Sequence, residues 1–313
     1  MSRKISLIGA GNIGGELAST IARKELAQEV VLFDIPAKAD FAKGKALDLE
    51  QAGSVLGYDT SIVGSSDWSD CAGSDVLIIT AGIPRKPGQD RKDLVATNLP
   101  IIRNVADNAK KHCPDAFVIV ISNPLDAMVY EFKRRTGWAK NKVVGMAGVL
   151  DSARFILFLA REAGVSVKDL RALVLGGHGD TMVPITSACT VNGAPLTEMI
   201  GKEKLDAIIA RTRKGGGEIV GLMGTSAYYA PAVSAVAMAE AYLNDQKRLL
   251  AGAAYLEGEY GYEGFFMGVP VVIGAGGVEK IVPFPLTDDE KKMLETSANA
   301  VRSIVEIVEA TAG

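Results

Sequence analysis

Short, almost wholly apolar runs alternate with longer amphipathic segments through the first half of the chain. The pattern predicts strands near 5–11, 29–35, 75–82 and 116–124. It predicts helices between them, near 13–26, 38–52 and 91–112. Strands that are apolar along their whole length are typical of a parallel sheet covered by helices on both faces. We therefore expect βαβ units and a Rossmann-type, doubly wound α/β domain.

After about residue 145 the rhythm changes. The pattern now predicts an apolar helix over 150–163, a strand leading to residue 178, helices over 202–222, 225–245 and 287–311, and β-rich segments over 249–258 and 266–282. We interpret this half as a second, α+β domain, and place the division at 1–145 and 146–313. Three consecutive glycines, 215–217, interrupt one predicted helix, so we expect a break or kink there.

Composition limits the function classes. Hydrophobic residues make up 48% of the 313 positions, enough for a sizeable core, and the net charge of −3 gives no attraction for nucleic acid or an anionic membrane. No apolar stretch long enough for a membrane helix or signal peptide occurs, so we expect a cytoplasmic protein. Cys71, Cys113 and Cys189 are too widely spaced to indicate a disulfide framework or a metal site.

A glycine motif connects the first predicted strand to the first predicted helix. The six residues that match G-x-G-x-x-G are Gly9, Ala10, Gly11, Asn12, Ile13 and Gly14. Such a motif lets backbone N–H groups at the start of a helix face a pyrophosphate. Asp34 ends the next strand, where it would accept hydrogen bonds from a ribose diol and repel a 2′-phosphate, which favours NAD over NADP. The alternative is a glycine turn in a nucleotide-free α/β protein.

Polar residues follow two further strands at the edge where open parallel sheets bind ligands. Arg85 and Arg91 lie six residues apart in the segment 81–94, "AGIPRKPGQDRKDL". This segment is either a solvated loop or a lid that brings guanidinium groups onto an anionic substrate. Asn123 follows the next strand, where it would hydrogen-bond a carbonyl group or simply form a strand-ending Asn-Pro turn.

The helix over 150–163 contains two charges on an otherwise apolar surface. Asp151 and Arg154 are three residues apart and share a face, and buried charges need partners. They either form a self-contained pair or have outside partners, a histidine for the carboxylate and a substrate carboxylate for the guanidinium. His178, between glycines in "GGHGD", is the candidate histidine. With Asp151 on one ring nitrogen, its other nitrogen would exchange a proton with a hydroxyl group.

Together, GAGNIG, VVLFD, AGIPRKPGQDR, ISNPLD, LDSAR and GGHGD resemble, in order and spacing, the lactate/malate dehydrogenase family. The resemblance implies a two-domain fold with NAD in the first half, malate/oxaloacetate as substrate, and a homodimer or homotetramer. It implies that His178 is the general acid/base, that Asp151 orients it, and that Arg154 binds the substrate's C1 carboxylate. It assigns Arg91 to polarising the reacting carbonyl and Asn123 to holding the substrate. Asn98 and the backbone of Ile121, Ser122 and Asn123 would line the cofactor.

In this family, the position six residues before the carbonyl-polarising arginine distinguishes substrates, and it is Arg85 here. A charge there favours the distal carboxylate of oxaloacetate over the methyl group of pyruvate. Ser226, with its small neighbours, would leave room for the dicarboxylate. Two alternatives remain: a lactate or broad 2-hydroxy acid dehydrogenase, and a non-catalytic NAD-binding protein.

Overall fold

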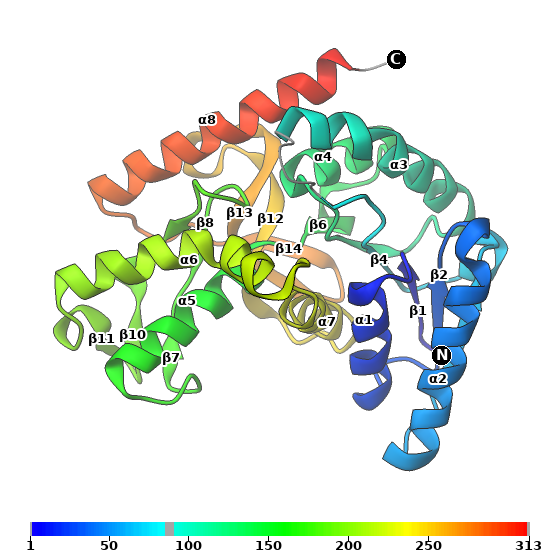
Figure 1. Ribbon diagram of the computed structural model, residues 1–313. Helices are drawn as coiled ribbons and strands as arrows, with labels where there is room; N and C mark the ends of the chain where they lie inside the picture. Colours follow the sequence, from blue (N-terminus) through cyan, green and yellow to red (C-terminus); the bar gives the residue numbers. More distant parts are fainter. Residues whose placement is uncertain (1, 85–90, 312–313) are drawn as a thin grey trace.

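The structure, a computed structural model, describes residues 2–84 and 91–311, apart from the side chain of Arg91 (Figure 1). Its first half contains six parallel strands: β1 (Lys4–Ile8), β2 (Glu29–Phe33), β3 (Ser61–Ser65), β4 (Val76–Ile79), β5 (Phe117–Val120) and β6 (Val143–Gly145). Their order in the sheet is β3-β2-β1-β4-β5-β6. This is the strand order of a doubly wound dinucleotide-binding fold, so the predicted fold class is confirmed.

Four helices connect these strands: α1 (Asn12–Arg23), α2 (Ala39–Leu56), α3 (Arg91–His112) and α4 (Leu125–Thr136). The central strand β1 shows why the strand sequences are so apolar. Its Leu7 pairs with Leu32 of β2 on one side and Ile78 of β4 on the other, and all three side chains are fully buried. The strand order reverses between β1 and β4, and sheets of this kind bind ligands at the carboxyl edge beside such a reversal.

The second half adds four helices: α5 (Gly148–Ala163), α6 (Lys202–Met223), α7 (Tyr229–Leu243) and α8 (Asp288–Ala310). It also supplies the long strands β12 (Arg248–Glu257), β13 (Glu263–Gly274) and β14 (Gly277–Ile281). Small sheets contain β7 (Leu170–Arg171), β8 (Val174–Leu175), β9 (Val183–Pro184), β10 (Thr190–Val191) and β11 (Ala194–Pro195). Short 3₁₀ helices occupy Pro36–Lys38, Trp68–Cys71, Lys140–Lys142, Thr186–Ala188, Leu196–Glu198 and Glu259–Gly261.

The two halves share one main sheet, which the sequence pattern did not predict. β12 runs antiparallel to β6, with Ala253 opposite Gly145, and extends the parallel sheet to nine strands through β13 and β14. Helices of both halves also pack together, since α7 lies against α1 and α8 lies against α4 (Figure 1). Residues of the second half are thereby brought to the carboxyl edge of the parallel strands.

Several expectations about elements are corrected. β3, β6 and α4 were not predicted, because β3 contains polar and glycine positions, β6 is three residues long, and α4 follows the Asn123-Pro124 turn directly. Glycines 215–217 do not end a helix, because α6 runs through them. Gly215 instead allows a close approach, since a Cβ there would lie 3.2 Å from Cδ of Arg154.

The three cysteines are buried and free of disulfides, as their spacing predicts. Within the described residues, no helix is both long enough and apolar enough to cross a membrane.

Candidate active site

The glycine motif forms a tight turn between β1 and α1. Gly9 has a φ of +121°, a conformation that favours glycine. A Cβ on Gly14 would overlap the carbonyl oxygen of Gly9, so this glycine lets helix and turn pack closely. A Cβ on Gly11 would meet nothing within 4 Å, which leaves the turn open to a ligand. The N–H groups of Asn12 and Ile13 at the start of α1 have no partners within the helix and suit an anionic group.

Two charged side chains fasten this turn to its surroundings. The Asp34 carboxylate accepts the N–H of Ala10 at 2.9 Å and the N–H of Ile35 at 2.8 Å. Lys45 of α2 donates from Nζ to the carbonyl oxygens of Ala10 at 3.0 Å and Gly11 at 2.7 Å. Burial lowers the pKa of Lys45, and the nearby Asp34 opposes that shift. The open turn, helix N-terminus and Asp34 together fit a dinucleotide.

Sequence analysis did not identify Lys45. It lies eleven residues after Asp34 and is one of two lysines in its helix, the other being Lys43. Its proximity to the turn depends on how α2 packs beside α1, which no local motif indicates.

The loops after β4 and β5 are joined by the residues expected to line the cofactor. The buried Asn98 amide accepts the N–H of Ile83 at 2.8 Å and donates to the carbonyl oxygens of Ile83 at 3.1 Å and Asn123 at 2.6 Å. Ser122 donates its hydroxyl to the carbonyl oxygen of Ala81 at 2.6 Å, and Ile121 is buried. Of these four residues only Asn123 is exposed, whereas Asn98, Ile121 and Ser122 are buried.

The charged pair of α5 and the histidine of the GGHGD segment meet. Nδ1 of His178 lies 2.8 Å from Oδ2 of Asp151, and Nη1 of Arg154 donates to the other carboxylate oxygen, Oδ1, at 3.1 Å. Asp151 is only 2% exposed, whereas His178 and Arg154 are 18% and 13% exposed. The sequence left two interpretations open, a self-contained pair of Asp151 with Arg154 or a histidine as the partner of the carboxylate. Asp151 makes both contacts at once, one through each carboxylate oxygen.

The environment of His178 favours its protonated form. Burial pushes the pKa of the imidazole downwards, but the charge and hydrogen bond of Asp151 more than offset this, and the resulting pKa is raised above the ordinary value. Arg154 opposes the rise, whereas Asp126 contributes to it. Because a carboxylate only accepts, Nδ1 carries the proton and Nε2 is left for a substrate hydroxyl or carbonyl group.

Arg154 retains donor capacity. Its Nε is buried and has no hydrogen-bond partner among the described residues, although its Nη1 bonds to Asp151. Close packing against Gly215 fixes the base of the side chain. A planar guanidinium held in this way suits a carboxylate ligand.

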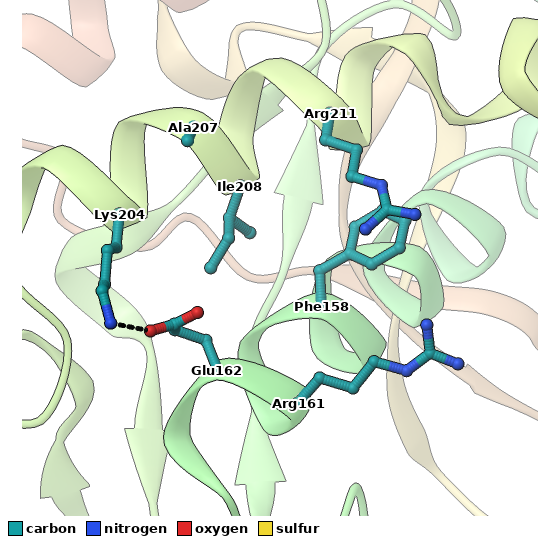
Figure 2. Close-up of a pocket in the computed structure, with 7 residues that line it drawn as sticks. All are labelled: Phe158, Arg161, Glu162, Lys204, Ala207, Ile208 and Arg211. Atoms are coloured by element: carbon teal, nitrogen blue, oxygen red, sulfur yellow. Dashed lines mark hydrogen bonds and ion pairs between the residues drawn. The ribbon is translucent and has the colours of Figure 1, made fainter.

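Two cavities differ in their size and in the residues that line them. One of about 20 Å³ touches His178 and lies between α4, the GGHGD segment and α8. The other, of about 320 Å³, lies between α5 and α6, where Lys204 pairs with Glu162 and Arg211 covers the ring of Phe158 (Figure 2). Arg211 also pairs with Glu218, so two of the three cations in this second cavity are already neutralised. No histidine lines this second cavity, so it offers no pairing of a histidine with a carboxylate. The candidate site is therefore the one at His178.

Some predicted site residues are not brought into this cluster. Arg85 and the side chain of Arg91, the first residue of α3, lie outside the described part of the structure. Ser226 is exposed in the connection between α6 and α7, and no hydrogen bond described here joins it to His178. Within residues 2–84 and 91–311, no group of three or more potential metal-binding side chains occurs.

Comparison with known proteins identifies the family. Residues 3–145 match the lactate/malate dehydrogenase NAD binding domain, and residues 148–312 match the lactate/malate dehydrogenase alpha/beta C-terminal domain. The chain belongs to the lactate/malate dehydrogenase family. It is an NAD-dependent dehydrogenase, and the predictions of the family, the enzyme class and the cofactor are confirmed.

Similar proteins match over their full length. The malate dehydrogenase of Sorangium cellulosum (strain So ce56) is 76% identical over 309 residues, which are 99% of this chain and 98% of that protein. The malate dehydrogenase of Myxococcus xanthus is 57% identical and covers 98% of each chain. Among solved structures, the Cryptosporidium parvum malate dehydrogenase superposes with a TM-score of 0.96 at 47% identity, covering 99% of this chain and 100% of that one. The Cryptosporidium parvum lactate dehydrogenase, complexed with lactic acid and β-nicotinamide adenine dinucleotide, has the same TM-score at 45% identity and covers 100% and 99%.

Proposed function

We propose that this dehydrogenase interconverts (S)-malate and oxaloacetate with NAD, and that His178 is its general acid/base. The observation that carries the proposal is the buried contact of 2.8 Å between His178 Nδ1 and Asp151 Oδ2 in a chain of this family. The full-length similarity to proteins named malate dehydrogenase supports the choice of substrate.

The contact determines what each group does. Asp151 holds the ring with its proton on Nδ1, so Nε2 accepts the proton of the malate hydroxyl. The imidazolium that forms is stabilised by the same carboxylate. In the opposite direction, protonated His178 donates from Nε2 to the oxygen of oxaloacetate, and Asp151 again fixes the orientation.

Other residues bind and polarise the substrate. Arg154 holds the C1 carboxylate, for which its buried Nε is available. We assign Arg91 to the reacting carbonyl and Asn123 to a second hydrogen bond with the substrate. The dinucleotide would be held by the turn from Gly9 to Gly14 and by Asp34, and when bound it supplies or accepts the hydride.

Substrate selection is assigned to Arg85 with the help of Ser226. A guanidinium that faces the methyl group of pyruvate would be buried without a partner, whereas the distal carboxylate of oxaloacetate would pair with it. The difference amounts to about 2–5 kcal/mol, or roughly 30- to several-thousand-fold in selectivity. Lactate dehydrogenase activity is the second candidate, because a lactate dehydrogenase superposes as well as a malate dehydrogenase does.

NADH absorbance with oxaloacetate or pyruvate tests the proposal. We expect strong preference for oxaloacetate, lost when Arg85 is replaced by glutamine, and a turnover lower by orders of magnitude in His178→Asn with little change in NADH affinity. Comparable rates with both substrates would favour a broad 2-hydroxy acid dehydrogenase. Near-normal turnover of His178→Asn would remove His178 from the mechanism, and failure to oxidise NADH with either substrate would indicate a non-catalytic NAD-binding protein.

We also propose a homodimer or homotetramer in which α2 contacts a second copy of the chain. Phe41, Leu47, Val55 and Leu56 of α2 are exposed, Val55 to 87%, although they are apolar. Light scattering should give a multiple of the 32.9 kDa chain mass, and Val55→Asp should lower it.

Cytoplasmic location and division into domains at 1–145 and 146–313 remain proposals. The buried free thiols fit a reducing compartment. Cell fractionation tests the location, and limited proteolysis around residue 146 tests the division.

A further inference from the structure

A second buried carboxylate lies beside His178. Asp126, in the first turn of α4, is 5% exposed, and its Oδ2 accepts the backbone N–H of His178 at 3.0 Å. Gly177 allows this approach, because a Cβ there would lie only 3.3 Å from the same oxygen. The contact comes from the D of ISNPLD, a position to which sequence analysis gave no function.

Asp126 meets His178 at its backbone. It lines the small cavity of about 20 Å³ together with His178, Thr181 and apolar residues of α8, including Val301. Its hydrogen bond with His178 is made to the backbone N–H, whereas the imidazole ring contacts Asp151 through Nδ1. Asp126 therefore acts through the position and the charge of His178.

Anchoring of the backbone does not by itself account for a carboxylate here. Gly176 exchanges two backbone hydrogen bonds with Gly268, at 2.9 and 3.0 Å, and the N–H of Gly177 donates to the hydroxyl of Ser297 at 2.8 Å. A neutral hydroxyl is thus sufficient for the neighbouring N–H. A buried carboxylate is costlier, although the N-terminus of α4 favours a negative charge in its first turn.

The negative charge of Asp126 and the positive charge of Arg154 act on His178 in opposite directions. His178 faces Asp151 and Arg154 from α5 and Asp126 from α4, whereas α8 presents uncharged Ser297 and Val301. Arg154 disfavours the imidazolium because it is also a cation. Asp126 adds negative charge that offsets this repulsion.

We propose that Asp126 is a positioning residue whose buried charge holds the backbone of His178 and stabilises its protonated ring against Arg154. The proposal rests on the acid/base function proposed for His178. Removal of the charge should then lower the pKa of His178 even if the hydrogen bond is kept.

Asp126→Asn provides that test, because its amide oxygen still accepts the N–H of His178. Glu131→Gln is the matched control: Glu131 is a fully buried carboxylate of the same helix that pairs with Arg103 and Arg134. The chain has only two histidines, so the ring signals of His178 and His112 can be followed by NMR and assigned with His112→Gln.

We expect His178 to titrate at lower pH in Asp126→Asn, and at unchanged pH in Glu131→Gln, while His112 serves as an internal reference. The alkaline limb of oxaloacetate reduction should move to lower pH in parallel, so that the rate on that limb falls by about tenfold for each pH unit moved. If Asp126→Asn does not fold, Asp126→Ser also keeps an acceptor without the charge.

An unchanged titration of His178 in Asp126→Asn would overturn the proposal. This holds even if turnover falls equally at all pH values, because such a fall would indicate that Asp126 only anchors the backbone. An equal shift in Glu131→Gln would also overturn it. The NMR titration does not require turnover. A normal rate in His178→Asn would therefore reject the acid/base function separately from the effect of Asp126 on the ring.

Discussion

Replacement of Asp151 by asparagine tests the centre of the site. The carboxylate receives two donors, His178 Nδ1 at 2.8 Å and Arg154 Nη1 at 3.1 Å. Asparagine offers one oxygen and one NH₂ group in the same shape. One of the two contacts must then bring a donor against a donor, and the imidazolium loses its counter-charge.

The magnitude follows from these contacts. A hydrogen bond to a charged group contributes about 1.5–3 kcal/mol, which corresponds to roughly 10- to 150-fold in rate if the imidazolium contact is lost in the transition state. Asp151 raises the pKa of His178, so its removal lowers that pKa and leaves less protonated histidine at neutral pH. Oxaloacetate reduction should suffer most above neutrality.

The free energy of unfolding should also depend on pH, because folding raises the pKa of His178. A histidine whose pKa is raised by folding stabilises the protein fully below the unfolded pKa of about 6.5, and this contribution is lost as the pH rises through the folded value. The difference in unfolding free energy between the wild type and Asp151→Asn should therefore be largest in acid and narrow as the pH rises. The Arg154 contact leaves a residual difference at all pH values.

Steady-state rates from pH 5 to 10 and urea unfolding at several pH values would measure both effects. Turnover within threefold of the wild type, together with an unmoved alkaline limb, would refute the assignment of Asp151 as the partner of His178. If the difference in unfolding free energy between the wild type and Asp151→Asn grew as the pH rises, the predicted pH dependence would be wrong.

Further substitutions at Arg154, in the glycine turn and at Lys45 address the remaining parts of the site. Arg154→Lys loses the planar fork, so the KM for oxaloacetate should rise by about 10- to 150-fold with a smaller change in NADH affinity; an unchanged KM would contradict carboxylate binding there. Gly14→Ala should lower the unfolding free energy by about 1–3 kcal/mol in urea, because its Cβ overlaps the backbone of the turn, whereas Gly11→Ala should fold normally and weaken NADH binding. Equal stability of the two glycine variants would contradict the packing argument. Lys45→Met should raise the NADH dissociation constant about tenfold in a fluorescence titration, since two hydrogen bonds that shape the turn are lost, and the exposed Lys43→Met is the control; equal values would contradict a role for Lys45.

Four of the parallel strands, β1, β2, β4 and β5, were predictable because they are buried on both faces. Residues such as Leu32 and Ile78 belong to short runs without polar interruption, and such runs are typical of buried strands. The continuation of the sheet from β6 into β12 was not predictable. The pairing of Gly145 with Ala253 joins residues more than a hundred positions apart, and no local pattern specifies which strand edge receives the next strand.

In the candidate site, sequence analysis identified those residues whose chemistry is unusual for their neighbours in the sequence. Asp151 is a charge in an apolar helix and His178 is a histidine between glycines, and these two do meet. Lys45 and Asp126 have no such anomaly, because Lys45 is one of two lysines in α2 and Asp126 is an ordinary acidic residue in a first helical turn. Their contacts with the turn and with His178 arise only from the packing of α2 and α4.

The sharing of Asp151 between His178 and Arg154 links substrate binding to protonation. In the proposed mechanism, a substrate carboxylate bound at Arg154 would compete with Asp151 for the guanidinium and would add a negative charge close to the imidazole. Both effects would favour protonated His178, the form that the proposed reduction of oxaloacetate requires. Bound malate would have the same effect, although its oxidation requires the neutral ring, so we expect oxidation to need a higher pH than reduction. The charge proposed to act from Asp126 would strengthen this asymmetry, because it would act on His178 in both directions of the reaction.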